Sequence, residues 1–150
     1  MRFGHVNLVA RDWQVLADFY CSYLGCTRLE PIRDLHGPLI DAGVGCADAR
    51  IRGVHVRLPG FGDNGPTLEI YRYDPLIDVP ANVRRSGFGH LAFQVDDIEA
   101  TRQALVHGGG TVSARSYPRA QVIVVSRGVM WLIPRAMPSS SNVGTQIDSC

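Results

Sequence analysis

Residues 87–98 read GFGHLAFQVDDI, and a shorter version of the same stretch opens the chain, where residues 3–9 read FGHVNLV. The two histidines, His5 and His90, set the offset between the copies at 90 − 5 = 85 positions. The same offset relates two further pairs of identical residues: Asp12 with Asp97, and Gly25 with Gly110. Self-similarity at a fixed offset is typical of a repeated structural unit. The sequence therefore predicts two copies of one module.

Each copy predicts the same order of elements. Apolar residues recur at alternate positions over 5–9 and 90–95, which is typical of a half-buried strand. A helical pattern follows in each copy, with Asp12 or Asp97 as its N-cap and glycines at its end. Three further strand candidates come after each helix: 27–32, 51–58 and 67–73 in the first copy, and 111–116, 121–125 and 129–133 in the second.

This order predicts an α+β fold in which two βαβββ modules form a cleft-shaped mixed β-sheet. We expect one domain over residues 1–138, with module 1 at about 1–73 and module 2 at about 87–134. Residues 74–86 hold two prolines and are predicted to be the linker. Residues 139–150 are mostly small or polar, so we expect a disordered tail.

Composition and charge exclude several classes of partner. The formal charge of +1, without a basic cluster, gives no electrostatic basis for binding nucleic acid or an acidic membrane. No apolar stretch reaches the roughly 20 residues that span a bilayer, and the chain leads straight into a strand pattern without a secretory signal. The four cysteines form no Cys-x-x-Cys pair, and we expect reduced thiols. The sequence predicts a soluble, cytoplasmic protein.

Strand alternation predicts which side chains face the cleft. If Val6 and Leu8 pack beneath the first helix, His5 and Asn7 point the other way. The same reasoning assigns further side chains to the cleft: His90 and Gln94 from the second copy, and Glu69, Tyr71 and Tyr73 from the strand at 67–73.

A carboxylate between the apolar neighbours of a central strand is costly to bury without a partner, and a cation would satisfy it. Two imidazoles and one carboxylate, from His5, Glu69 and His90, suit one divalent metal ion. The spacing does not choose among zinc, nickel, cobalt, manganese and iron(II). A simpler interpretation also stands, in which the histidines are ordinary hydrogen-bonded strand residues and Glu69 pairs with an arginine.

Three segments resemble the vicinal oxygen chelate superfamily, which includes glyoxalase I, methylmalonyl-CoA epimerase, extradiol dioxygenases and the bleomycin and fosfomycin resistance proteins. The first is FGHV at residues 3–6 with the helix end that follows it, the second is TLEI at 67–70, and the third is the stretch at 87–98. The resemblance covers about residues 1–117. It implies a glyoxalase-like fold, a homodimer, and metal-ligand positions at His5, Glu69 and His90.

The C-terminus departs from that pattern. Glyoxalase-like members carry a fourth ligand, a glutamate on the last strand after an Asp-Pro-x-Gly-Asn turn, and residues 126–134 contain neither. If the codons of residues 129–141 are read in a shifted frame that starts at the third base of each codon, the genetic code permits a sequence with both the turn and the glutamate. We therefore hypothesise that a frameshift just before Val129 produced this C-terminus, and sequencing the gene tests it.

The resemblance implies three candidate functions. The first is a metal-dependent lyase or isomerase that chelates vicinal oxygens of a small substrate. Here Glu69 is catalytic, Asn7, Tyr71, Tyr73 and Gln94 bind substrate, and the missing glutamate weakens activity. The second is a non-haem iron dioxygenase, and the third is a non-catalytic protein that binds an antibiotic or another small molecule. The sequence leaves these alternatives open.

Overall fold

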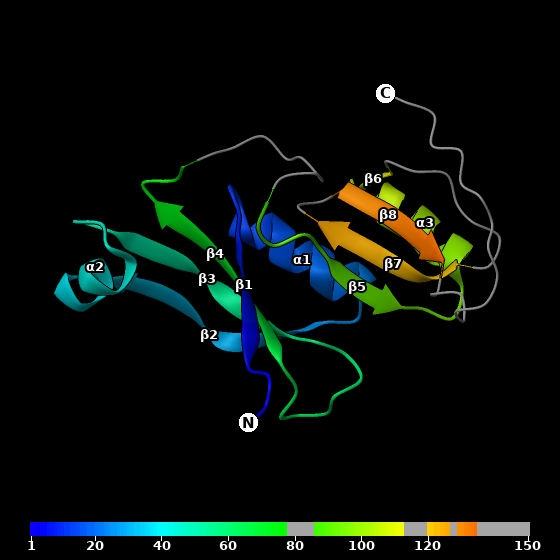
Figure 1. Cartoon of the computed structure of the whole chain (residues 1–150), viewed down its shortest axis with the longest axis horizontal. Coiled ribbons are helices and arrows are strands. Elements are labelled where there is room, and N and C mark those ends of the chain that lie inside the picture. Colours follow the sequence, from blue (N-terminus) through cyan, green and yellow to red (C-terminus); the bar gives the residue numbers. More distant parts are fainter. Residues whose placement is uncertain (78–85, 113–119, 127–128, 135–150) are drawn as a thin grey trace.

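The first half of the chain forms one mixed four-stranded sheet. The computed structural model describes residues 1–77, 86–112, 120–126 and 129–134 (Figure 1). The elements of this half, in chain order, are β1 (His5–Val9), α1 (Trp13–Tyr23), β2 (Thr27–His36), α2 (Pro38–Val44), β3 (Arg50–Arg57) and β4 (Thr67–Asp74). The strand order is β1-β4-β3-β2, in which β1 runs parallel to β4 and the other neighbours are antiparallel.

The second half forms a second four-stranded sheet from β5 (Leu91–Gln94), α3 (Ile98–His107), β6 (Thr111–Val112), β7 (Ala120–Ser126) and β8 (Val129–Pro134). Its order is β5-β7-β8-β6, with β5 antiparallel to β7 and β6 parallel to β8. In the second half the first strand, β5, pairs with the third strand, β7. In the first half the first strand, β1, pairs with the fourth strand, β4. The α+β fold, in which each half places a helix after its first strand, is confirmed, and the two sheets differ in pairing.

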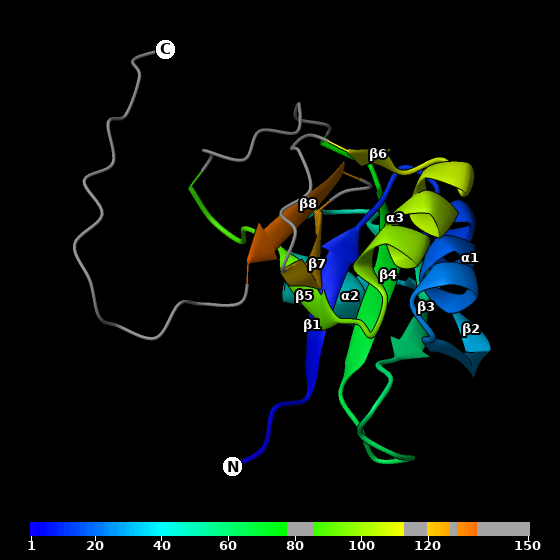
Figure 2. The same ribbon diagram turned by 90° about the vertical axis from the view of Figure 1, so that its right-hand side faces the viewer.

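The two main helices lie side by side on one side of the molecule (Figure 2). Beneath α1, the side chains of Val54, Val56, Leu68 and Ile70 have no exposed surface, and Leu105 of α3 joins the same core. Tyr20 of α1 meets Phe93 of β5 with ring centroids 6.1 Å apart, so one apolar core connects both halves. The alternation predicted for the strand at 67–73 is confirmed, since Leu68 and Ile70 face this core. Val6 and Leu8 also pack against this core as expected.

Both predicted helix caps are present. Asp12 accepts hydrogen bonds from the backbone N–H groups of Gln14 and Val15, each at 3.0 Å, and Asp97 accepts one from Ala100 at 2.9 Å. These carboxylates satisfy donors that the first turn of a helix leaves without a partner. The sequence signal was reliable because a cap depends only on residues close in the chain.

We expect Asp12→Ala to lower the free energy of unfolding by about 1 kcal/mol, because it removes the cap of the helix that covers the core. Urea unfolding followed by circular dichroism measures the change. Asp12→Asn keeps a side-chain acceptor and should stay close to the parent. Equal losses in both variants would contradict the capping role.

The stretch at 33–50 differs most from expectation. The sequence predicted a strand only over 27–32, yet β2 continues to His36 and the short helix α2 follows. Pro38 stands in the first turn of α2, and Gly45 ends it with φ of 68°. These residues favour a helix start and a helix end, and they are the signal that was missed. In the second half, residues 113–116 and the tail at 139–150 lie outside the described residues.

Candidate functional site

The face of the first sheet that points away from α1 carries polar side chains on three neighbouring strands. We call it the polar face and define it by His5, Asn7, His55, Thr67, Glu69, Tyr71 and Tyr73. The register explains how they meet, because Glu69 lies opposite Asn7 of β1 and opposite His55 of β3. Directly opposite residues project to the same side of a sheet. The named side chains of β1 and β4 therefore point away from α1, as expected.

Glu69 lies between two imidazoles. Its Oε2 atom is 3.5 Å from Nε2 of His5, and its Oε1 atom is 3.3 Å from Nε2 of His55. The Glu69 side chain is 19% exposed and that of His55 is 22% exposed, whereas that of His5 is 54% exposed. Among the described residues, no arginine forms an ion pair with this carboxylate. A mostly buried carboxylate held only by imidazoles retains a need for positive charge.

His55 is the residue that the sequence did not assign. Its Nε2 atom lies 2.8 Å from the hydroxyl of Tyr71, and its Nδ1 atom lies 3.5 Å from Oγ1 of Thr67. Burial lowers the pKa of His55, although the charge of Glu69 opposes this. Burial and the charge of Glu69 both raise the pKa of Tyr71. Both groups are therefore held neutral around pH 7, and a neutral imidazole keeps one nitrogen available as an acceptor.

The remaining predicted residues stand in different positions. Asn7 is exposed, and its Nδ2 atom is 3.5 Å from the backbone oxygen of Glu69. Tyr73 is half-buried on the polar face, where burial and the charge of Glu69 raise its pKa. His90 precedes β5, Gln94 ends it, and both are exposed. The structure brings His5 and Glu69 together and does not bring His90 to them.

The donor set fits a metal ion in part. Two ligands about 2.1 Å from one tetrahedral ion stand roughly 3.4 Å apart, and the atoms of His5 and Glu69 are 3.5 Å apart. In the described part of the chain, however, no group of three or more His, Cys, Asp or Glu side chains is placed to hold an ion. His5 and Glu69 could thus supply two neighbouring ligands to an ion, and a complete centre would need a third.

Comparison with known proteins decides the family. A family model described as the Glyoxalase/Bleomycin resistance protein/Dioxygenase superfamily matches residues 2–118. The chain belongs to this superfamily. Small-molecule substrates or ligands are bound across the glyoxalase/bleomycin resistance/dioxygenase superfamily, and a divalent metal is common in it.

Two solved structures share the fold of this superfamily member. A glyoxalase family protein from Bacillus cereus aligns with a TM-score of 0.64 at 16% identity, over 88% of this chain and 91% of the other. A glyoxylase/bleomycin resistance protein/dioxygenase domain from Frankia sp. EAN1pec aligns with a TM-score of 0.58 at 17% identity, over 90% of this chain and 98% of the other. None of the curated proteins matches the chain. Among the described helices, none is long and apolar enough to cross a membrane.

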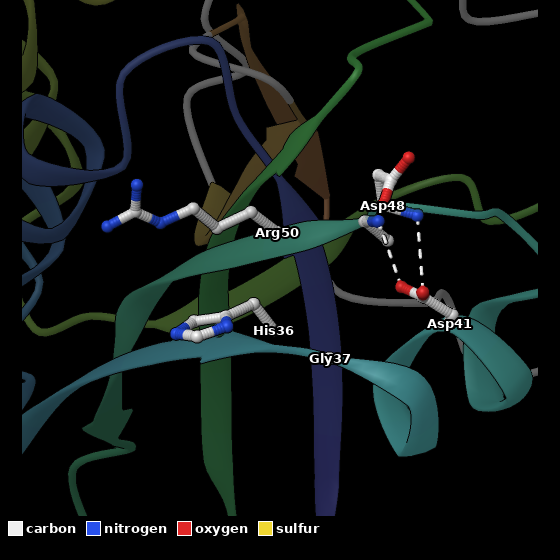
Figure 3. A pocket seen from close by; sticks show the side chains of 6 residues that line it. His36, Gly37, Asp41, Asp48 and Arg50 are labelled. Atoms are coloured by element: carbon white, nitrogen blue, oxygen red, sulfur yellow. Dashed lines mark hydrogen bonds between the residues drawn. The ribbon is translucent and has the colours of Figure 1, made fainter.

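A pocket of about 430 Å³ lies away from the polar face, where β2, α2 and β3 meet (Figure 3). Its wall includes His36, Asp41 and Arg50. The Asp41 carboxylate accepts hydrogen bonds from the backbone N–H groups of Asp48 and Ala49, at 3.2 and 2.9 Å. Arg50 is paired with Asp34. These charged groups hold the local fold together, and we assign the pocket no chemical role.

Proposed function

We propose that this chain binds a small molecule with adjacent oxygen atoms on the polar face, together with one divalent metal ion that His5 and Glu69 ligate. The observation that carries the proposal is the position of Glu69, mostly buried, with an imidazole at each carboxylate oxygen. A divalent cation would supply positive charge beside this carboxylate. The structure supports this pair of ligands without choosing zinc, nickel, cobalt, manganese or iron(II).

The third ligand in this proposal is His90, either of this chain or of the second subunit of a cytoplasmic homodimer. The repeat supports the choice, since His90 matches His5 in sequence and immediately precedes β5 as His5 begins β1. His90 is exposed and therefore accessible to a partner. Size-exclusion chromatography with light scattering tests the dimer, and metal content tests the ligand.

We propose a lyase or isomerase reaction as the activity. A bound divalent ion would act as a Lewis acid that stabilises negative charge on the substrate oxygens. Glu69 then has a second task as the carboxylate that moves a proton. Asn7, Tyr71, Tyr73 and Gln94 are the side chains that we assign to orienting the substrate. The last strand supplies no glutamate, so we expect activity below that of a four-ligand enzyme.

A second candidate is a non-catalytic protein that sequesters a small molecule. The rings of His55 and Tyr73 favour it, because both belong to the polar face and both are only partly buried. Flat ligands stack well on such rings. Oxygen uptake with a catechol and added iron(II) would instead indicate the dioxygenase alternative.

Metal content by mass spectrometry on tag-free protein tests the proposal. We expect about one equivalent of a transition metal per chain after reconstitution, and its loss in a His5→Ala, His90→Ala double variant. His36→Ala is the matched control, since His36 is an exposed histidine outside the polar face. Parent protein without metal after reconstitution would refute the metal-dependent activity and leave the binding role.

A further inference from the structure

One arginine shares the polar face. Arg33 of β2 lies opposite Gly53 of β3, and Gly53 lies opposite Tyr71 of β4. Since directly opposite residues project to the same side, the side chains of Arg33 and Tyr71 stand on one face in one row. Only a glycine lies between them, so no side chain separates the guanidinium from the phenol.

The row depends on the absence of a side chain at Gly53. A Cβ atom there would lie 2.2 Å from Cδ1 of Tyr71 and 2.1 Å from the backbone oxygen of Ile70. The Tyr71 ring therefore occupies the space over Gly53 and extends toward β2. Burial and the charge of Glu69 raise the pKa of Tyr71, while the charge of Arg33 opposes that rise. The charge of Arg33 also contributes to the lowered pKa of His55, after burial. The register itself therefore places Arg33 on the same face as the Tyr71–His55 pair.

The charge of Arg33 is not neutralised within the described part of the chain. Strands β2, β3 and β4 carry five other arginines, and each forms an ion pair with an aspartate: Arg28, Arg50, Arg52, Arg57 and Arg72. No carboxylate of the described residues forms an ion pair with Arg33, although its side chain is half-buried. A partly desolvated guanidinium without an ion pair in the described part of the chain is suited to an external anion, which it can bind through two parallel hydrogen bonds.

We propose that Arg33, which shares a row of the polar face with Tyr71, binds a carboxylate or phosphate group of the small-molecule substrate. The inference deepens the proposed function and rests on it for the position of the substrate's reacting end at Glu69. Residues 69 and 71 are two positions apart on β4, or roughly 7 Å along a strand. The substrate class is therefore a small anionic molecule whose charged group lies a few bonds from its adjacent oxygens.

Binding of two simple anions to metal-free protein tests the site. Inorganic phosphate and acetate are titrated at constant ionic strength and pH, and the imidazole C–H signals of His55 are followed by NMR. We expect saturable binding with a Kd of about 1–10 mM. Arg33→Gln should weaken binding at least 10-fold. Arg28→Gln is the matched control, since Arg28 lies on the same strand opposite Val56 of the core, and it should leave the Kd unchanged.

The two anions distinguish the sources of the ligand. Tighter binding of phosphate would assign a phosphate ester, and tighter binding of acetate would assign a carboxylate substrate. Failure of saturable binding to either anion in the parent would overturn the inference, as would an unchanged Kd in Arg33→Gln.

Glu69→Gln separates this inference from the proposed function. The variant removes a proposed metal ligand and a nearby negative charge, so it should lose metal and bind the anions as well as the parent or more tightly. If Glu69→Gln loses metal but Arg33→Gln leaves the anion Kd unchanged, the anion site alone is refuted. Anion binding in a parent that takes up no metal would refute the metal site alone.

Discussion

Glu69→Gln is expected to reduce metal affinity at least 100-fold without lowering the stability of the metal-free protein. The carboxylate is mostly buried between His5 and His55, and among the described residues it has no arginine to neutralise it. An uncompensated charge in such a place costs free energy, whereas the neutral amide can donate to an imidazole nitrogen. We therefore expect the unfolding free energy of the metal-free variant to be unchanged or to rise by about 1 kcal/mol.

Metal titration and urea unfolding of chelator-treated protein measure the two effects. Glu99→Gln is the control, because Glu99 is a carboxylate of α3 paired with Arg102 far from the polar face. A loss of stability in Glu69→Gln with full metal content would show that the carboxylate has a structural role. A protein that keeps a costly charged group for function at the expense of stability follows a common trade-off.

Much of the scaffold of this site could be predicted from the sequence because it depends on local alternation. In β4, Leu68 and Ile70 are apolar and fully buried, which forces Glu69 onto the opposite face. The same reasoning placed His5 on that face, and the register then aligned β1 with β4. Alternation has a period of two, so one buried face determines the other.

The contribution of β2 and β3 could not be predicted in this way. Strand β3 is buried on both faces for part of its length, so its sequence shows no clear alternation around His55. Strand β2 has an irregular register between Leu29 and Arg33, and this shift decides which residue of β2 stands opposite Gly53. The pairing shifts there by two positions, which changes the residues that stand opposite each other, and the position of such an irregularity depends on the neighbouring strand.

The relation between His5 and His90 shows the limit of the repeat. Equivalent positions in two modules predict equivalent surroundings only if the modules pair their strands alike. Here β1 pairs with β4, while β5 pairs with β7. His90 consequently stands beside a different set of strands from His5, and its place in a metal site stays a prediction that the double variant tests.

Gly53→Ala is expected to destabilise the fold by about 2–4 kcal/mol, which is large for the addition of one methyl group. The new Cβ atom would meet the backbone oxygen of Ile70 at 2.1 Å and the Tyr71 ring at 2.2 Å. The ring can move aside, but the oxygen belongs to the backbone of a central strand. Relief therefore requires β3 and β4 to separate, above a core in which Ile70 has no exposed surface.

Urea unfolding of Gly53→Ala beside Gly43→Ala isolates this steric effect. Gly43 lies in α2, and a methyl group added there would have no atom within 4 Å, so alanine should be neutral or stabilising by up to about 1 kcal/mol. In Gly53→Ala the displaced ring should also weaken phosphate binding, since Tyr71 shares the row with Arg33. A stable Gly53→Ala variant with parental anion affinity would mean that Tyr71 does not depend on the glycine. In that case only β2 would hold Arg33 in position. Strand β2 is poorly suited to do so alone, because its register with β3 is irregular.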